Sequence, residues 1–343
     1  MKSLLVASYL EPVHVERVRA VASGAVRVTC EPSLLPRPRY AADHVGAPLA
    51  RTPDEESRWR ALLREADILF DFDHTNLAAL PDLASRVRWL QATSAGIGQL
   101  VHRHDLARRM PHTTFTTASG VHAQPLAEFA ILGMLASTRR LFTMLESQRR
   151  AHWERFAGAD LLGKTALIYG YGAIGMEIAR VASVFGVRCI GINRSGRAAP
   201  GSAAAEVHGP GALRALLPQA DFLVLAAPHT PETEGAFGAT ELGCLKRGAF
   251  VINVARGALL AEAALVDALA SGHLGGAALD VFETEPLPQT SPLWAMPNVL
   301  VSPHSASTSA RENELIVDLF CDNLQRHLEG RALRNVLDTT LLY

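Results

Sequence analysis

The feature that most constrains the fold is a glycine-rich turn, Tyr169-Gly170-Tyr171-Gly172-Ala173-Ile174-Gly175, near the middle of the chain. The apolar run Thr165–Ile168 precedes it, and a segment with helical spacing follows it. A strand, a G-x-G-x-x-G turn and a helix in this order are typical of dinucleotide binding, because the glycines let a pyrophosphate and the helix approach the backbone closely. The N–H groups at the start of the helix then face the phosphates. The turn predicts a dinucleotide site made of Gly170, Tyr171, Gly172, Ala173, Ile174 and Gly175.

Composition excludes several classes of partner. The 343 residues suffice for about two domains, and the net charge of −1 gives no basic field that would attract nucleic acid. The apolar start, Leu4–Ala7, is too short for a signal sequence, and no run approaches the length of a membrane span. The cysteines form no C-x-x-C pair, which is typical of reduced thiols. We therefore expect a cytoplasmic protein that binds neither nucleic acid nor a membrane and holds no metal.

Alternating strand and helix patterns after Lys164 predict an α/β fold with a parallel, doubly wound sheet of about six strands. The expected strands are Thr165–Ile168, Val187–Ile192, Phe222–Ala226, Phe250–Val254, Gly276–Val281 and Val299–Val301. Before Lys164 the same alternation predicts a second, smaller α/β domain. Its expected strands are Leu4–Ser8, Ala25–Thr29, Asp67–Phe70, Val87–Gln91 and Thr113–Thr117.

Two long helices are also predicted. The first covers residues 123–150, and its apolar first half suits burial between domains or at a dimer interface. Its second half is basic, for which a solvated or interface face is a better explanation than an anion site. The second long helix covers residues 307–329. Between residues 31 and 51, frequent proline and arginine predict an irregular loop.

A small polar cluster, Asp71, Asp73 and His74, follows the predicted strand Asp67–Phe70. It could be a site or half of a metal site. No further ligand spacing supports a metal, so a polar loop at a strand end is the favoured interpretation.

The end of the second strand of the dinucleotide unit indicates which cofactor binds. In NAD-binding units this strand is followed by Asp or Glu, about 20 residues past the glycines. Here the strand leads into Asn193, Arg194 and Ser195, without a carboxylate. Arg194 can neutralise a 2′-phosphate and Ser195 can donate a hydrogen bond to it, whereas an acidic residue would repel it. NADP(H) is therefore favoured over NAD(H), with an ordinary basic loop as the alternative.

Residues with charged or proton-transferring side chains follow three later strands of the same predicted sheet. Arg256 follows Phe250–Val254, Asp280 and Glu285 lie at the end of Gly276–Val281 and just beyond it, and His304 follows Val299–Val301. Ligands of open α/β sheets bind at this edge. Each residue alone could be structural, but together they supply a cation, a carboxylate and an imidazole next to a nicotinamide site.

In these stretches the chain closely resembles the D-isomer-specific 2-hydroxyacid dehydrogenases, from about Trp89 to Asn323. The glycine turn and four further motifs match in order and spacing: Ala227–Thr233, Asn253–Gly257, Asp280–Pro288 and Ser302–His304. Roughly the first 85 residues carry little family signature. The resemblance implies two Rossmann-like or flavodoxin-like domains. A dinucleotide-binding domain, residues 121–304, would be inserted into a discontinuous substrate-binding domain, residues 1–120 plus 305–343.

The resemblance also implies roles for individual residues. Arg256 would bind the substrate carboxylate and polarise its carbonyl, His304 would donate the proton, and Glu285 would hold the His304 ring and favour its protonated form. Asp280 would bond the nicotinamide carboxamide. The implied cofactor contacts further include Ala227, Pro228, Thr233, Val254, Ala255, Arg256 and His304. The implied substrate contacts are Ser94, Ala95, Gly96 and Ile97, through backbone N–H groups, with Arg256 and His304.

The leading hypothesis is an NADPH-dependent reductase that converts a 2-oxo acid, such as glyoxylate or hydroxypyruvate, to a D-2-hydroxy acid. The alternative is a dinucleotide-sensing binding protein, like the corepressors that share this fold and keep its catalytic residues. A formate dehydrogenase is set aside because that enzyme has glutamine where Glu285 stands. The family is usually homodimeric through its cofactor domains, so a homodimer is expected.

Overall fold

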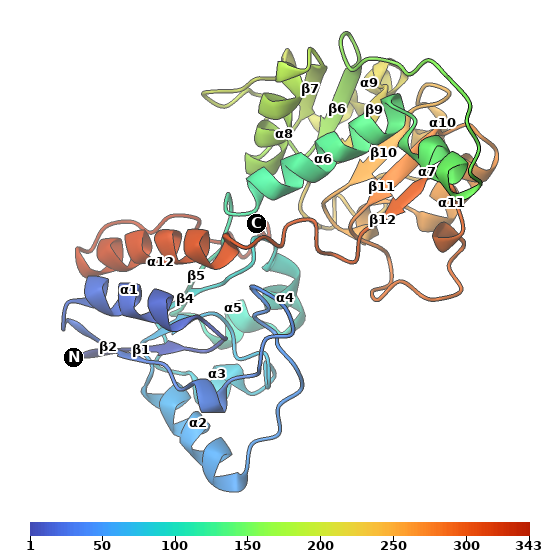
Figure 1. Ribbon diagram of the computed structural model, residues 1–343. Helices are drawn as coiled ribbons and strands as arrows, with labels where there is room; N and C mark the ends of the chain where they lie inside the picture. Colours follow the sequence, from blue (N-terminus) through green and yellow to red (C-terminus); the bar gives the residue numbers. More distant parts are fainter. The chain divides into compact units, whose positions relative to one another are not determined.

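A computed structural model describes residues 1–343 and divides the chain into two compact units (Figure 1). The first unit combines Met1–His122 with Thr308–Tyr343, and the second unit is the continuous segment Ala123–Ser307. Each unit holds one sheet in which all paired strands run parallel. The prediction of an α/β protein with two doubly wound parallel sheets is thereby confirmed.

The sheet of the first unit has the order β2-β1-β3-β4-β5. Its strands are β1 (Lys2–Val6), β2 (Val26–Thr29), β3 (Ile68–Phe70), β4 (Trp89–Gln91) and β5 (Thr114–Thr116). The helices are α1 (Pro12–Ala22), α2 (Pro53–Glu65), α3 (Leu80–Leu83), α4 (Gly98–Arg103), α5 (Leu106–Arg109) and α12 (Glu312–Leu328), with a 3-10 turn η1 (Pro32–Leu34).

Strand alternation divides the core of the first unit between the two faces of its sheet. Leu4 packs with residues of α1 and α12, whereas its neighbour Leu5 packs with residues of α2 to α5. Phe320 of α12 stacks on Trp89 of β4 with 5.0 Å between ring centroids. Helix α12, the red helix beside α1 in Figure 1, therefore belongs to the core of the first unit although it lies near the end of the chain.

The sheet of the second unit has the order β12-β11-β10-β9-β6-β7-β8. Its strands are β6 (Thr165–Tyr169), β7 (Arg188–Ile192), β8 (Glu206–His208), β9 (Phe222–Leu225), β10 (Phe250–Asn253), β11 (Gly276–Leu279) and β12 (Val299–Val301). The helices are α6 (Ala123–Thr138), α7 (Leu141–Arg149), α8 (Ala173–Val184), α9 (Leu213–Leu216), α10 (Ala239–Gly243) and α11 (Glu262–Ala270). Four 3-10 turns complete it: η2 (Pro210–Ala212), η3 (Leu217–Gln219), η4 (Gly257–Leu259) and η5 (Pro292–Trp294).

Helices cover both faces of this second sheet. Residues of α6 and α8 form one apolar cluster with Ile168, Val224 and Ile252, and residues of α9 to α11 form another with Leu167 and Leu223. The strand order changes direction between β6 and β9, which is the position where ligands bind in doubly wound sheets. None of the helices in either unit combines the length and the apolar character that a membrane crossing requires.

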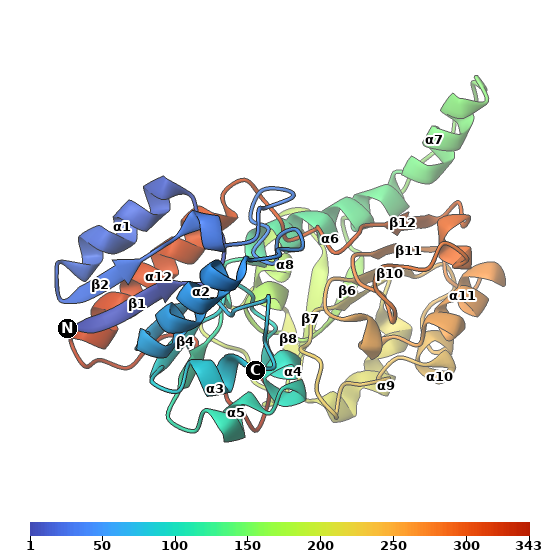
Figure 2. The same cartoon turned by 90° about the horizontal axis from the view of Figure 1, so that it is seen from below.

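The prediction of one helix over residues 123–150 was wrong. Helix α6 ends at Thr138, whose hydroxyl donates to the Met134 carbonyl at 3.0 Å, and Arg140 adopts a left-handed conformation with φ 56°. A new helix, α7, begins at Leu141 and buries none of its residues. Figure 2 shows α7 extending away from the sheet of the second unit. The helical pattern continues through Arg140 although the backbone turns there, and Phe142 of α7 still packs partly against the core, stacking on Phe250.

Two smaller expectations were also wrong. The second unit has a seventh strand, β8, which was missed because it is short and polar; it pairs with β7. Helix α12 begins at Glu312 rather than at Ser307. The intervening residues are mainly serine and threonine, whose side chains compete for backbone hydrogen bonds at the start of a helix.

Candidate active site

The glycine turn follows β6 at the switch point of the second sheet. Gly170 has φ 100°, and a Cβ there would overlap the backbone of Ala227 at the end of β9. The N–H groups of Gly170 and Tyr171 both donate to the Ile192 carbonyl, at 2.9 and 2.8 Å. A Cβ on Gly172 would meet nothing within 4 Å, so the start of α8 opens onto free space. The first N–H groups of a helix have no partner within it, and here they border that space.

A compact turn follows β7, where the sequence predicts the 2′-phosphate site. The Asn193 side chain holds this turn together: its Oδ1 accepts from Gly196 N at 2.8 Å and from Ser195 Oγ at 3.1 Å, and its Nδ2 donates to the Arg197 carbonyl. Arg194 and Ser195 are exposed. Asn193 therefore shapes the turn that presents both.

The loop after β9 closes on itself. The Thr233 hydroxyl donates to the Pro228 carbonyl at 2.7 Å and accepts from Thr230 N at 2.8 Å. Ala227 is buried and Pro228 is exposed. Glu232 lies on the same loop. Hydrogen bonds from Thr230 and from its own backbone, together with the charge of Arg194, hold the pKa of Glu232 below its usual range.

The segment after β10 positions Arg256. Asn253 is 1% exposed; its Oδ1 accepts from Ala255 N at 3.0 Å, and its Nδ2 donates to the Arg256 carbonyl at 3.2 Å. Val254 and Ala255 are buried beside it. Asn253 thus fixes the direction in which the chain leaves the strand.

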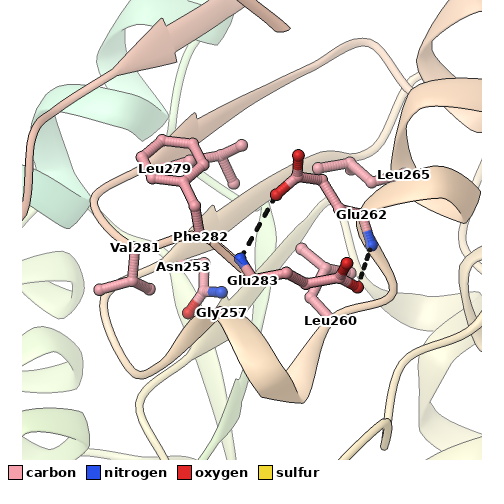
Figure 3. A pocket seen from close by; sticks show the side chains of 9 residues that line it. All are labelled: Asn253, Gly257, Leu260, Glu262, Leu265, Leu279, Val281, Phe282 and Glu283. Atoms are coloured by element: carbon pink, nitrogen blue, oxygen red, sulfur yellow. Dashed lines mark hydrogen bonds between the residues drawn. The ribbon is translucent and has the colours of Figure 1, made fainter. Parts of the chain in front are cut away.

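Gly257, which follows Arg256, brings the segment after β10 into contact with the loop after β11. Gly257 lies directly against the backbone of Phe282 and Glu283, where a Cβ would overlap it. Figure 3 shows a second connection: Glu262 N donates to Glu283 Oε1 at 2.8 Å, and Glu283 N donates to Glu262 Oε2 at 3.4 Å. The segment after β10 and the loop after β11 are therefore held against each other by close backbone contact and by two hydrogen bonds.

Glu285 and His304 are joined by a hydrogen bond beyond the ends of β11 and β12. Glu285 Oε2 lies 2.7 Å from His304 Nδ1, and Glu285 Oε1 accepts from Phe282 N at 3.0 Å. Burial opposes ionisation of Glu285, but the His304 hydrogen bond, the Phe282 hydrogen bond and the Arg256 charge outweigh it and hold the pKa of this carboxyl below its usual range. The His304 side chain is 44% exposed, so its ring is paired but accessible.

Asp280 holds the backbone that carries His304. Its Oδ1 accepts from Ser302 Oγ at 2.6 Å, Ser305 N at 2.8 Å and Ala306 N at 2.9 Å, and its backbone carbonyl accepts from His304 N at 2.9 Å. His304 has φ 54°, which is uncommon for a residue with a side chain. The bonds to Asp280 offset the strain of that conformation.

Arg256 is close enough to Glu285 and Asp280 for their charges to act on it. Burial lowers the pKa of Arg256, and the two carboxylates oppose this shift. The second unit thus brings together Arg256, Asp280, Glu285 and His304, which the sequence placed on three separate segments. A partly buried cation beside an ionised carboxylate and an imidazole can bind a small anion and transfer a proton to it.

The predicted substrate turn, Ser94–Ile97, belongs to the first unit and follows β4. Ser94 and Gly96 are exposed, and Ile97 is buried and accepts from Val101 N at 2.9 Å. The Ser94 carbonyl accepts from Ala118 N at 3.1 Å.

The polar cluster near this turn is held by its own side chains. Asp71 Oδ2 lies 3.2 Å from His74 Nε2, and Asp73 Oδ2 accepts from Trp59 Nε1 at 3.0 Å. Burial would raise the pKa of Asp71, but the His74 charge and hydrogen bond outweigh it and lower the pKa to about 2. Asp71 in turn outweighs the effect of burial on His74, whose pKa is raised.

Two positioning residues had no role in the sequence-based interpretation. Asn253 and Ser302 lie inside motifs that the sequence singled out, and each bonds to a segment next to a candidate residue. A polar side chain at the end of an apolar strand was the available signal, because such a side chain needs a partner once it is buried.

The fold and this site define a dinucleotide-dependent oxidoreductase. The family model for the D-isomer specific 2-hydroxyacid dehydrogenase, NAD binding domain, matches residues 131–306. A glyoxylate reductase from Aeropyrum pernix is 34% identical over 233 residues, which cover 65% of this chain and 69% of that protein. The chain belongs to the D-isomer specific 2-hydroxyacid dehydrogenase family.

Solved structures agree with this assignment. A D-isomer specific 2-hydroxyacid dehydrogenase from Xanthobacter autotrophicus Py2, in complex with NADPH and MES, is 28% identical with a TM-score of 0.80 and covers 100% of this chain and 99% of its own. An NADPH-dependent glyoxylate/hydroxypyruvate reductase from Sinorhizobium meliloti, in complex with NADP and sulfate, is 25% identical with a TM-score of 0.78 and covers 100% of both chains. Both likenesses extend over the two units.

Proposed function

We propose that this protein reduces a small 2-oxo acid, such as glyoxylate or hydroxypyruvate, to a D-2-hydroxy acid, with NADPH as its favoured cofactor. The observation that carries the proposal is the Glu285–His304 pair, 2.7 Å apart, with the partly buried Arg256 beside Glu285. The printed names of the relatives support the substrate class, because several are glyoxylate reductases.

Each candidate catalytic residue has a role that suits the chemistry of its side chain. Arg256 binds the substrate carboxylate and polarises the neighbouring carbonyl, since a guanidinium offers paired donors. His304 donates a proton to the carbonyl oxygen from Nε2, because Nδ1 faces Glu285. Glu285 orients the ring and stabilises its protonated form.

The second unit has the features that a dinucleotide requires. The turn from Gly170 to Gly175 opens at Gly172, and the start of α8 offers N–H groups for the pyrophosphate. We assign the nicotinamide side to Val254, Ala255 and Asp280, and the adenosine side to Ala227, Pro228 and Thr233. When bound, the reduced nicotinamide supplies the hydride.

NADPH is favoured by the turn after β7. No carboxylate follows this strand, and the exposed Arg194 and Ser195 are presented by Asn193. Arg194 already lies near one carboxylate, Glu232, which indicates that its side chain can meet an anion there. We assign Arg194 to the 2′-phosphate.

The first unit would supply the remaining substrate contacts. We assign the backbone N–H groups of the turn Ser94–Ile97 to the substrate carboxylate. The domain roles follow from these assignments: residues 1–120 with 305–343 bind substrate, and residues 121–304 bind the cofactor.

A homodimer completes the proposal. Helix α7 and the segment after it expose large apolar side chains, including Met144 at 41%, Leu145 at 39% and Trp153 at 92%. Apolar groups on one projecting element are typical of a surface that a partner covers. A second copy of this chain is the proposed partner.

The experiment that tests the activity is NADPH oxidation with glyoxylate, hydroxypyruvate, pyruvate and phenylpyruvate. We expect turnover with glyoxylate, with hydroxypyruvate, or with both. NADPH binding without turnover of any 2-oxo acid would instead favour a dinucleotide-sensing binding protein.

A further inference from the structure

The Tyr171 side chain has a role that its place in the glycine turn does not suggest. It is only 3% exposed and packs into the cluster that lies beneath α6 and α8. Its hydroxyl lies 2.9 Å from Ser202 Oγ and accepts from Ala204 N at 2.9 Å. A residue of the pyrophosphate turn is therefore bonded to a segment about thirty residues further along the chain.

Strand β7 leaves room for this connection. A Cβ on Gly191 would lie 2.5 Å from Cγ of the Tyr171 ring. Only glycine lets the ring lie flat against the strand at this point, so the hydroxyl can reach the loop beyond it. Gly191 and Tyr171 thus form a matched pair of a small and a large residue.

The segment that Tyr171 holds is the far end of the loop between β7 and β8. This loop carries Arg194, Ser195 and Arg197, which are all exposed. Its near end is closed by Asn193, which binds the Arg197 carbonyl and Gly196 N. Its far end is held by the Tyr171 hydroxyl and, at Ala205, by a backbone bond to the Cys189 carbonyl at 2.8 Å.

We infer that Tyr171 is a positioning residue for recognition of the 2′-phosphate of NADPH. The inference rests on the proposed use of this loop for that phosphate. With the hydroxyl in place the loop is ordered before the cofactor arrives, so binding does not have to order it. Without the hydroxyl this entropic cost falls on NADPH, whose phosphate uses the loop, and not on NADH, which lacks the phosphate.

The matched test is Tyr171→Phe, which keeps the ring against Gly191 and removes only the hydroxyl. The dissociation constants of NADPH and NADH are measured from the fluorescence of the reduced nicotinamide. We expect NADPH to bind roughly three- to tenfold more weakly, the size of one buried hydrogen bond, and NADH to change by less than about twofold. Ser202→Ala, which removes one of the two partners of the hydroxyl, is expected to give a smaller effect of the same kind.

A second readout does not depend on cofactor preference. Trypsin cleaves after arginine, and Arg194 and Arg197 lie on the loop. Tyr171→Phe is expected to be cut there faster than the wild type, and NADPH is expected to slow the cutting in both proteins.

The outcomes separate the two claims. If Tyr171→Phe weakens the binding of NADPH and NADH equally, the role of Tyr171 is overturned. The role is also overturned if Tyr171→Phe weakens neither cofactor and is cut by trypsin at the wild-type rate. A wild-type protein that binds NADH as tightly as NADPH would overturn the proposed phosphate site itself. The inference holds if NADPH is preferred and that preference falls in Tyr171→Phe.

Discussion

Glu285 Oε2 lies 2.7 Å from His304 Nδ1, although the two residues follow different strands, β11 and β12. The pair is stable in this position because Phe282 N bonds the second Glu285 oxygen and Asp280 holds the turn around His304. The orientation of the imidazole therefore depends on Glu285.

Replacing Glu285 by glutamine tests whether the carboxylate itself is needed. Glu285→Gln keeps a hydrogen-bonding side chain but removes the negative charge beside the His304 ring. We expect kcat for 2-oxo acid reduction near neutral pH to fall by about 10²-fold, with little change in the Kd of NADPH. The matched control is Glu283→Gln, an exposed carboxylate two residues away, which should retain most activity. Equal losses in the two variants would contradict the specific role of Glu285.

Arg194 is expected to set the cofactor preference. Arg194→Ala removes the charge assigned to the 2′-phosphate, so the Kd of NADPH should rise by about tenfold or more while that of NADH stays nearly constant. Glu232→Gln should have the opposite sign, since it removes a carboxylate near Arg194 that competes with the phosphate. Calorimetric titration with both cofactors measures each effect. Equal changes for NADPH and NADH in Arg194→Ala would refute the assignment.

Asp71 should make the stability of the protein depend on pH. Its pKa is about 2 in the folded chain against an ordinary value of 3.8, so its contribution is present above pH 3.8 and is lost as the pH falls from 3.8 towards 2. The contribution is about 2 kcal/mol. The raised pKa of His74 adds stability that is full below the ordinary value of 6.5 and is lost as the pH rises through the raised pKa.

Asp71→Asn should therefore lower the free energy of unfolding most between pH 3.8 and 6.5, where Asp71 is ionised and His74 is protonated. Asparagine tolerates the positive φ of 67° at this position, so the backbone need not change. Urea denaturation at several pH values measures the effect, and Asp318→Asn serves as an exposed control. A loss of the same size at every pH, including below about pH 2, would contradict the electrostatic explanation.

Trp153 provides the test of the proposed dimer. Trp153→Ser removes the most exposed large apolar side chain of the second unit, and Met144→Asp places a charge on α7. We expect the double variant to be monomeric by light scattering at concentrations where the wild type is dimeric. Trp294→Ser, at a 53% exposed site of the same unit, is the control and should leave the mass unchanged. A monomeric wild type would contradict the proposal.

The sequence predicted the candidate site of the second unit better than the polar cluster of the first. The central strands of the second unit are continuous apolar runs, which is what a sheet buried on both faces requires, and the candidate residues stand where those runs end or just beyond. Arg256, Asp280, Glu285 and His304 could therefore be selected before their contacts were known. In the first unit, the Asp71 and His74 pair could not be distinguished from an ordinary polar loop.

Other features depended on contacts that no local pattern records. The break at Arg140, which has φ 56°, could not be predicted because helical spacing itself continues through it. The Ser302 bond to Asp280 joins residues that follow different strands, so it becomes visible only when those strands are side by side. Tyr171 was assigned to the cofactor as a member of the glycine turn, whereas its side chain is buried in the protein.

The most direct test of the central claim is a single-turnover measurement of NADPH oxidation by the wild type and by His304→Ala, with glyoxylate or hydroxypyruvate in excess. We expect His304→Ala still to bind NADPH but to oxidise it at least about 10²-fold more slowly. Arg256→Ala should also be slow, and raising the concentration of the 2-oxo acid should restore only part of its rate. Wild-type rates in His304→Ala would contradict the account.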